Sequence, residues 1–356
     1  MNAVQALCTE ASSRFSELRA ELCTAFVDGL NRAGITYCLL SGFESYPNPG
    51  DGDLDFMVLP RDSAKLAPIL GAVTRGSRAL LVQAIQHETD AWYLVLAKQT
   101  RDEVGYFDAD CTTDYRRNGR LWLRAEHVLA RRRRSGGFYV AAKPDEFLYY
   151  LIKKVLKQEI TREHLRRLRE LYAAAPEECC EGMRRFWRTD TVRMMTGGIL
   201  RSDDHGMRLL AGRLLAELEE SAQVENWAGR CAQQTAELRR RWWRVVNPTG
   251  LSVRVWGGRE PERNQLAAAM VDSLRPAFRR TLLTRDARTS DELSEWLARV
   301  RSTLVLKTSE PRPKGPLRRT MDVCEVNVTE HDVESATRLV LEQMARRIQK
   351  RGRVGA

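Results

Sequence analysis

Short apolar runs and amphipathic segments alternate along the first part of the chain. Apolar residues recur at helical spacing over residues 4–33, and Gly34 follows at the position of a helix C-cap. The apolar runs Cys38–Leu40 and Phe56–Val58 predict two short buried strands. The segment between these runs is rich in Gly, Pro, Asn and Asp, which predicts a turn. We therefore expect a helix followed by a pair of strands.

A further helix and more strands are expected downstream. Residues 62–70 have helical spacing of their apolar positions. Residues 80–85 and 92–97 predict a pair of strands, with residues 86–90 as their turn. Residues 105–114 predict another strand, because polar and apolar positions alternate along it.

After Pro144 the pattern becomes helical, and after Asn247–Gly250 strands and helices alternate again. The expected elements are helices over 147–160, 165–172, 179–187 and 207–243, a strand over 251–256, a helix over 266–274, strands over 303–307 and 321–328, and a helix over 331–351.

These patterns predict an α/β protein in three parts. The first is an α+β domain over residues 1–135, the second a helical domain over 136–246, and the third an α/β domain over 247–356. Gly136–Gly137 and Asn247–Gly250 supply the predicted boundaries, because such residues are typical of linkers.

Composition narrows the class of protein. The chain has 356 residues, enough for two or three domains, and a net charge of +11. No apolar run is long enough for a membrane helix, and the first residues lack the apolar segment of a signal peptide, so we expect a cytoplasmic protein. The eight cysteines include no CxxC pair, which argues against zinc and favours reduced thiols. The basic charge permits a polyanionic partner, and a solvated surface that favours solubility is the alternative.

The strongest chemical signal is Asp53-Leu54-Asp55 at the start of the second strand. Strand side chains alternate between faces, so Asp53 and Asp55 share one face while Leu54 points into the core. Two neighbouring carboxylates repel each other unless they are exposed or a hard cation such as Mg²⁺ lies between them. The sequence therefore predicts either a metal site suited to phosphoryl or nucleotidyl transfer or an acidic surface turn.

The order of these residues resembles the polymerase-beta-like nucleotidyltransferase superfamily. The first strand ends in Ser41-Gly42, and Asp53 and Asp55 follow on the next strand, as in that family. The resemblance extends over residues 1–135 and implies that Ser41 and Gly42 approach the triphosphate while the two aspartates bind Mg²⁺. This chain departs from the family at Phe43, where a second small residue is usual.

The resemblance also implies a third carboxylate on a neighbouring strand, which orients or deprotonates the attacking hydroxyl and completes the metal shell. Asp110 is the first choice, because the polar run 112–119 that follows it resembles the family pattern. Asp108, on the same face of the same predicted strand, is the second choice. An exposed strand face without catalytic function is the alternative for both residues.

Two groups of basic residues could contact phosphate. The run Arg131–Arg134 predicts either a solvated helix end or a phosphate clamp. Lys153, Lys154 and Lys157 lie within one helical turn of each other and predict either a solvated helix face or a phosphate contact.

The tail resembles a thymidylate-kinase-like P-loop domain over residues 251–356. Its strand, Gly257-Gly258 turn and helix have the order of a P-loop. A working loop ends in Gly-Lys-Ser/Thr, whereas this chain has Arg263-Asn264-Gln265 there. Glu260 and Glu262 add negative charge where phosphates would bind. We therefore expect a degenerate P-loop domain with a structural or partner-binding role.

The leading functional hypothesis is a Mg²⁺-dependent nucleotidyltransferase. It would use Asp53, Asp55 and Asp110 to move a nucleoside monophosphate from a nucleoside triphosphate to an acceptor hydroxyl. The alternative is an inactive protein of the same fold that serves as a structural or regulatory partner in a bacterial biosynthetic cluster. A nucleic-acid-binding protein ranks last, because the sequence contains no recognised binding motif.

Overall fold

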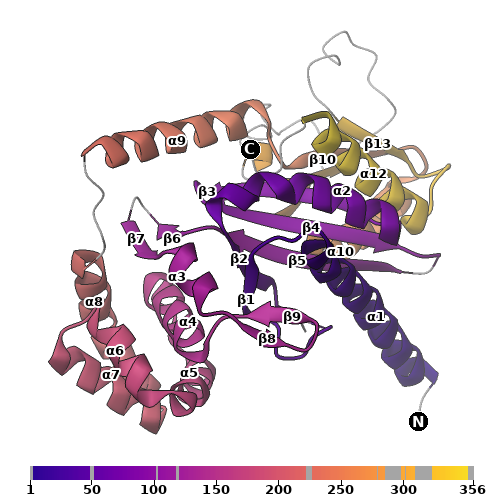
Figure 1. Ribbon diagram of the computed structural model, residues 1–356. Coiled ribbons are helices and arrows are strands. Elements are labelled where there is room, and N and C mark those ends of the chain that lie inside the picture. The colour runs from indigo at the N-terminus through magenta and orange to yellow at the C-terminus, as the bar shows by residue number, and fades with distance from the viewer. Residues whose placement is uncertain are drawn as a thin grey trace.

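The computed structural model describes residues 3–48, 52–101, 103–117, 120–221, 227–278, 280–284, 298–300, 302–308 and 323–351. These residues form a seven-stranded mixed sheet, a four-stranded parallel sheet, a small hairpin and a set of helices (Figure 1). The predicted α/β class is therefore confirmed. In this part of the chain, no helix is both long enough and apolar enough to cross a membrane.

The seven-stranded sheet has the order β3-β4-β5-β2-β1-β9-β8. Its strands are β1 (Tyr37–Ser41), β2 (Leu54–Val58), β3 (Leu80–Glu88), β4 (Ala91–Gln99), β5 (Val104–Thr112), β8 (Arg133–Ser135) and β9 (Phe138–Val140). The pairs β1–β2, β3–β4, β4–β5 and β8–β9 are antiparallel, whereas β2–β5 and β1–β9 are parallel. In the parallel pair β2–β5, Leu54 and Asp55 at the start of β2 lie beside Ala109 and Asp110 near the end of β5.

One face of this sheet is covered by α1 (Ala3–Arg32) and α2 (Leu66–Ser77). The ring of Phe26 on α1 lies 5.2 Å from that of Phe56 on β2 and 5.6 Å from that of Phe107 on β5, measured between centroids. Because strand side chains alternate, residues next to Phe56 and Phe107 project from the opposite face.

The opposite face carries two separate cores. Cys38, Leu40 and Met57 of β1 and β2 pack against the helical group. This group consists of α3 (Ala125–Ala130), α4 (Lys143–Lys157), α5 (Arg162–Ala174), α6 (Pro176–Arg184), α7 (Thr189–Arg201) and α8 (Asp204–Ser221). Val95 and Tyr106 of β4 and β5 pack instead against the C-terminal part of the chain. Polar residues at the ends of β2 and β5 lie between these two cores.

The C-terminal sheet is parallel throughout, in the order β11-β12-β10-β13. Its elements are β10 (Leu251–Trp256), α10 (Glu260–Leu274), the short 3-10 helix Arg275–Ala277, β11 (Arg280–Thr284), β12 (Thr303–Thr308), β13 (Val323–Asn327) and α12 (Val333–Arg351). The Tyr106 hydroxyl donates a hydrogen bond of 2.8 Å to the carbonyl of Ser273 near the end of α10, which joins the two sheets.

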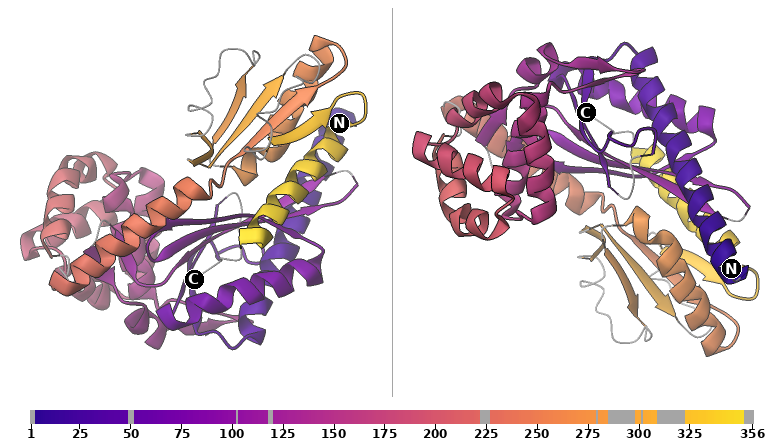
Figure 2. Two further views of the ribbon diagram at one scale, coloured as in Figure 1. Left: turned by 90° about the horizontal axis from the view of Figure 1, so that it is seen from above. Right: turned by 90° about the horizontal axis from the view of Figure 1, so that it is seen from below.

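The long helix α9 (Trp227–Val246) runs from the helical group to the C-terminal sheet (Figures 1 and 2). It passes the edge strand β3, where Arg240 Nη1 donates to the carbonyl of Gln86 at 3.0 Å. The Thr89 hydroxyl, just beyond β3, donates to Glu237 at 3.3 Å. These two hydrogen bonds therefore hold α9, which connects the helical group with the C-terminal sheet, against the first sheet.

The structure corrects several predicted elements. Residues 60–65 form a 3-10 helix, and the α-helix predicted over 62–70 begins at Leu66 and ends at Ser77. Pro60 starts the 3-10 segment, and the glycines at 71 and 76 do not end the helix, because its apolar face continues against the sheet. The helix predicted over 207–243 is wrong as a single element, since α8 ends at Ser221 and α9 begins at Trp227. Helix α7 was not predicted.

Two hairpins were also missed. One is formed by β6 (Tyr115–Arg117) and β7 (Arg120–Leu123), and the other by β8 and β9. Gly136, with a φ of +60°, lies in the β8–β9 turn rather than in a linker. The first sheet therefore continues past the boundary predicted at residue 135, while the three-part division itself stays a prediction. Residues 321 and 322 of the predicted strand 321–328 lie outside the described residues.

Candidate functional site

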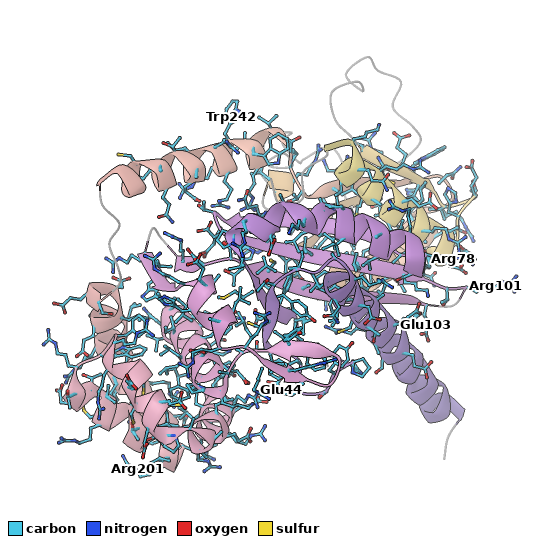
Figure 3. The ribbon with its side chains drawn as sticks, viewed as in Figure 1. Glu44, Arg78, Arg101, Glu103, Arg201 and Trp242 are labelled. Carbon is cyan, nitrogen blue, oxygen red and sulfur yellow. The ribbon has the colours of Figure 1, made fainter. Side chains whose placement is uncertain are left out.

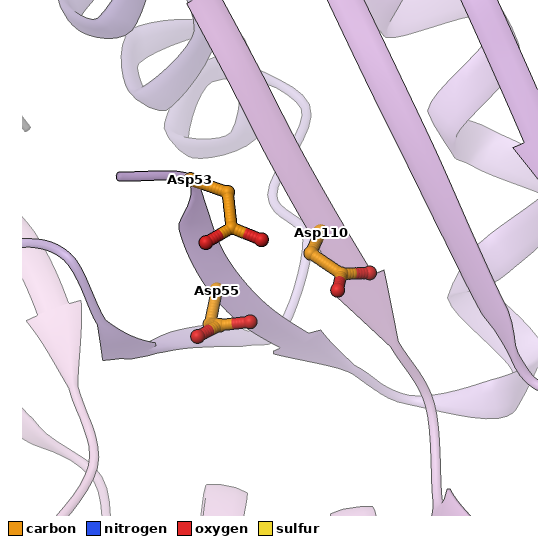
Figure 4. Close-up of side chains that lie close together, drawn as sticks. All are labelled: Asp53, Asp55 and Asp110. Carbon is orange, nitrogen blue, oxygen red and sulfur yellow. The ribbon is translucent and has the colours of Figure 1, made fainter. Parts of the chain in front are cut away.

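The candidate site is a cluster of carboxylates at the ends of β2 and β5. In the parallel pair of these strands, Asp55 lies in register with Asp110, and Asp53 precedes β2 on the same face. One oxygen atom from each of Asp53, Asp55 and Asp110 lies within 4.8 Å of the others (Figure 4). The structure thus brings together all three residues that the sequence suggested.

The turn after β1 supports the first of these carboxylates. Gly42 has a φ of +81°, and a Cβ atom there would lie 2.4 Å from the carbonyl oxygen of Asp53. Only glycine allows this close approach of two backbone segments. The Ser41 hydroxyl donates a hydrogen bond to Oδ2 of Asp55. Ser41 and Gly42 therefore contact the carboxylate segment directly, and their contact with a triphosphate stays a prediction.

Phe43, the departure from the family pattern, points away from the carboxylates. Its side chain is only 9% exposed and belongs to the core beneath α1 and α2. Its ring packs edge-on against Phe138 of β9, with centroids 6.4 Å apart. The bulky residue at this position thus fills the core.

The helical group anchors the same turn. The Arg167 guanidinium of α5 donates hydrogen bonds to the carboxylate of Glu44, which follows Phe43, and to that of the buried Glu146 of α4. Glu44 is labelled in Figure 3, where it lies between the sheet and the helical group. Burial raises the pKa of Glu146, while Lys143 and Arg167 oppose that shift. This ionic contact links the position of the Gly42 turn to α4 and α5.

Helix α4 places a positive charge on the carboxylate cluster. Lys153 Nζ lies 2.7 Å from Oδ1 and 2.6 Å from Oδ2 of Asp55. Tyr149, one turn earlier on α4, also hydrogen-bonds Asp55. For Lys153 the sequence predicts either a phosphate contact or a solvated helix face. Nothing in the sequence indicates Tyr149 as a site residue. The other two lysines do not share this position: Lys154 packs over the ring of Tyr150, and Lys157 is exposed.

The electrostatics of the cluster favour a cation. Burial raises the pKa of Asp110 well above its usual range, and the neighbouring charge of Asp55 raises it further. Burial lowers the pKa of Lys153, but the attraction of Asp55 and Asp53 outweighs this effect and the net shift is upward. Removal of positive charge from this cluster therefore disfavours the ionised carboxylates.

Asp108, the second choice for the third carboxylate, lies outside the triad. It shares a face of β5 with Asp110, but it lies two residues earlier on the strand, nearer to Tyr106 and the C-terminal sheet. Burial raises the pKa of Asp108 to about 6, which Arg19 and a hydrogen bond from Tyr93 partly oppose. This environment differs from that of Asp110, whose main charged neighbours are Asp55 and Lys153.

His87 was not predicted as a site residue, because the sequence suggested a turn over 86–90. Strand β3 instead extends to Glu88, with an irregularity between Gln86 and Glu88 that turns His87 towards the site. Nε2 of His87 lies 3.5 Å from Oδ1 of Asp110. The ring thus forms one wall beside the third carboxylate.

The arginine run 131–134 lies elsewhere. Arg133 and Arg134 belong to β8, an edge strand separated from β2 by β1 and β9. Arg131 pairs with Asp145 at 3.6 Å and also with Glu178, and Arg132 lies over the ring of Tyr139. Arg131 and Arg132 therefore have partners within the protein, and the run lies away from the triad.

The glycine turn of the tail is filled by its own side chains. Gly257 and Gly258 have φ values of +79° and +55°. Arg263, only 7% exposed, donates from Nη1 to the carbonyl of Gly258 at 2.8 Å and to that of Gly257 at 3.4 Å. Glu262 is occupied by Arg259. Nη1 of this guanidinium therefore donates to the loop itself, at the carbonyls of both glycines.

Comparisons with known proteins add little to this geometry. No family model matches the chain, and no curated protein matches it. A solved structure described as a "putative nucleotidyltransferase from H. pylori" aligns with 58% of this chain and 96% of its own, at 13% identity and a TM-score of 0.29. A likeness this weak carries no argument, so the functional conclusion rests on the site.

Proposed function

We propose that this protein is a metal-dependent nucleotidyltransferase that moves a nucleoside monophosphate from a nucleoside triphosphate to an acceptor hydroxyl. The observation that carries the proposal is the carboxylate triad, in which oxygens of Asp53, Asp55 and Asp110 lie within 4.8 Å of one another. The glycine turn beside it packs directly against the backbone of Asp53 and so positions the start of the triad.

The donor set fits a hard divalent cation. All three groups are carboxylates, and Mg²⁺ prefers oxygen ligands. The Lys153 ammonium on Asp55 supports the fit, since the cluster already accommodates a positive charge at that position. When bound there, Mg²⁺ supplies charge neutralisation on the triphosphate and a lower pKa for the acceptor hydroxyl.

The protein's own groups divide the remaining work. Asp53 and Asp55 would hold the metal, and the backbone at Gly42 would approach the triphosphate. Asp110, in register with Asp55, would complete the metal shell and orient or deprotonate the attacking hydroxyl. His87 borders Asp110 and would limit the space for the acceptor.

Lys153 has a defined part in this proposal. In the ligand-free protein its ammonium is the counter-ion of Asp55. A divalent cation on the same carboxylate would compete with it. The released side chain, flexible and carrying up to three donors, would then be available to the substrate's phosphates.

Calorimetric titration of the full-length protein with a non-hydrolysable nucleoside triphosphate tests the proposal, with and without Mg²⁺. We expect Mg²⁺-dependent binding in the wild type and its loss in Asp53→Asn and Asp55→Asn. The matched control is Asp190→Asn, because Asp190 is an exposed aspartate that also pairs with a basic residue, Arg213. Equal triphosphate affinity in all four proteins would remove the proposed site.

The same titration separates the second candidate, a non-catalytic protein of this fold. The observation in its favour is the Lys153–Asp55 pair, which also satisfies the carboxylate without any metal. If the protein is non-catalytic, the wild type should bind no triphosphate in the presence of Mg²⁺. Lys153→Met should then lower the stability of the protein and should not create a metal site.

A further inference from the structure

A second cavity lies away from the carboxylate triad. It has a volume of about 680 Å³ and is bounded by the edge strand β3, by α9 and by the end of α12. None of Asp53, Asp55 and Asp110 lines it. Figure 2 shows how α9 and α12, two of the elements that bound it, run beside the first sheet. Its size falls in the range of small-molecule sites, about 300–1,000 Å³.

The body of the cavity is apolar. Ile85 and Trp92 contribute from the first sheet, Trp243 from α9, and Met344 and Ile348 from α12. These residues come from three separate regions of the chain, so the cavity exists only when those regions are packed together. Three indole rings, those of Trp92, Trp242 and Trp243, line the cavity and favour a ligand with a flat or aromatic body.

The charged side chains that line the cavity are all positive. Its lining includes Arg239, Arg240, Arg244 and Arg347, whereas no Asp or Glu among the described residues lines it. The charge of Arg240 is balanced by Glu237, which lies outside the lining, and this pair holds α9 against β3. The electrostatic complement of such a cavity is an anion.

Arg239 is the arginine best placed to bind a ligand. It follows Glu237 on α9, but within the described part of the chain it takes part in no ion pair. Its side chain is exposed, so it stands at the mouth of the cavity rather than in its wall. A guanidinium here can donate two parallel hydrogen bonds to a carboxylate, sulfonate or phosphate without losing an existing partner.

We propose that this cavity binds a small organic anion, with its apolar, flat body against Trp92 and Trp243 and its anionic group on Arg239. The site is distinct from the carboxylate triad, because none of the three aspartates lines this cavity. The two sites share only β3, which lines the cavity through Gln86 and borders Asp110 through His87. The proposal therefore stands without the proposed transfer activity.

The test uses two fluorescent probes and the full-length protein. Anilinonaphthalene sulfonate carries an aromatic body and an anionic group, and phenylnaphthylamine has nearly the same body without the charge. We expect one sulfonate probe to bind per chain, more tightly than the neutral probe. Arg239→Gln should weaken the sulfonate by about tenfold, the size of one lost ionic hydrogen bond, and leave the neutral probe unchanged.

Arg241→Gln is the matched control, since Arg241 lies on the same helix, is 70% exposed and does not line the cavity. It should bind both probes as the wild type does. Ala236→Phe, which adds a ring to the lining, should weaken both probes. Circular dichroism of each variant shows that it is folded. If that variant does not fold, the Arg239 and Arg241 pair still decides.

Equal sulfonate affinity in wild type and Arg239→Gln would overturn the proposal. So would an equal loss in Arg241→Gln, because the effect would then follow overall charge rather than this cavity. Several probes bound per chain with no response to Ala236→Phe would also overturn it, since that pattern is typical of scattered surface binding.

Discussion

Two glycine turns of similar backbone shape lie in this protein, and one of them borders the carboxylate triad. Gly42 follows β1 and Gly257 follows β10, with φ values of +81° and +79°. Beside Gly42 lie three carboxylates that face each other across two strands. Beside Gly257 lie Arg263 and Asn327, whose side chains bond the loop and its neighbours.

The comparison shows that a glycine turn alone does not define an anion site. A Cβ at Gly42 would meet the backbone oxygen of Asp53, so the turn is needed to position that carboxylate segment. A Cβ at Gly257 would meet Oδ1 of Asn327 at 2.1 Å, a contact that only fills the loop. The first turn positions a cluster of three carboxylates, whereas the carbonyls of the second accept hydrogen bonds from the nearby Arg263.

The largest expected effect is on the chemistry of the first site. Asp110→Asn should reduce transfer by about a thousandfold, because it removes the proposed proton acceptor. Triphosphate binding should persist, since Asp53 and Asp55 remain. The measurement is pyrophosphate release together with calorimetric binding.

Asp108→Asn is the control for that experiment, because Asp108 shares the strand face but not the triad. It should retain most of the activity. If Asp108→Asn is the inactive variant and Asp110→Asn is active, the third carboxylate has been assigned to the wrong residue.

The two turns can be compared directly by alanine substitution. Gly42→Ala and Gly257→Ala should each lower the free energy of unfolding by about 1–3 kcal/mol, the cost of a non-glycine residue in such a conformation. Only Gly42→Ala should also weaken Mn²⁺ binding, because its methyl group would push against the carbonyl of Asp53. Chemical denaturation and electron paramagnetic resonance of bound Mn²⁺ measure the two effects. A loss of Mn²⁺ affinity in Gly257→Ala as well would contradict the distinction.

Local pattern was sufficient to find the triad, but not its surroundings. The alternation of strand side chains placed Asp53, Asp55 and Asp110 on one face, and such alternation is visible in a sequence. Lys153 reaches Asp55 across 98 positions of the chain, which no local pattern encodes. His87 was hidden because a strand irregularity redirects it, and this irregularity has no mark in the sequence.

The fold shows the same limit. Long apolar stretches predicted the buried strands and the first helix, whereas β8 was missed because its residues, Arg133–Ser135, are polar. That strand forms because it pairs with β9, which in turn pairs with β1. The break between α8 and α9 was likewise missed, since apolar residues continue through both helices. Tertiary pairing, rather than local preference, decides these elements.

A smaller effect is expected at Lys153. Lys153→Met should tighten the binding of Mn²⁺ alone by about tenfold, because the competing ammonium is removed from Asp55. Triphosphate affinity in the presence of metal should fall, since a phosphate donor is lost. Lys154→Met is the matched control on the same helix and should change neither value, because Lys154 packs over Tyr150 instead. Unchanged Mn²⁺ affinity in Lys153→Met would show that the lysine and the metal do not share the carboxylate.

The smallest expected effect is at the tail, where we expect no nucleotide binding at all. The full-length Asp55→Asn variant removes the first site from the measurement, and calorimetry with ATP and Mg²⁺ should then give no heat of binding. The physical reason is that Arg263 already donates to the carbonyls of Gly257 and Gly258, and no lysine follows it. A helix N-terminus contributes only about 0.3–1 kcal/mol for a nearby anion, too little to replace those missing ligands. In the same background, the changes Arg263→Gly, Asn264→Lys and Gln265→Ser should introduce measurable ATP affinity, because they free the loop and restore its cation and hydroxyl. Micromolar ATP binding before those changes would make the two turns equivalent and the comparison wrong.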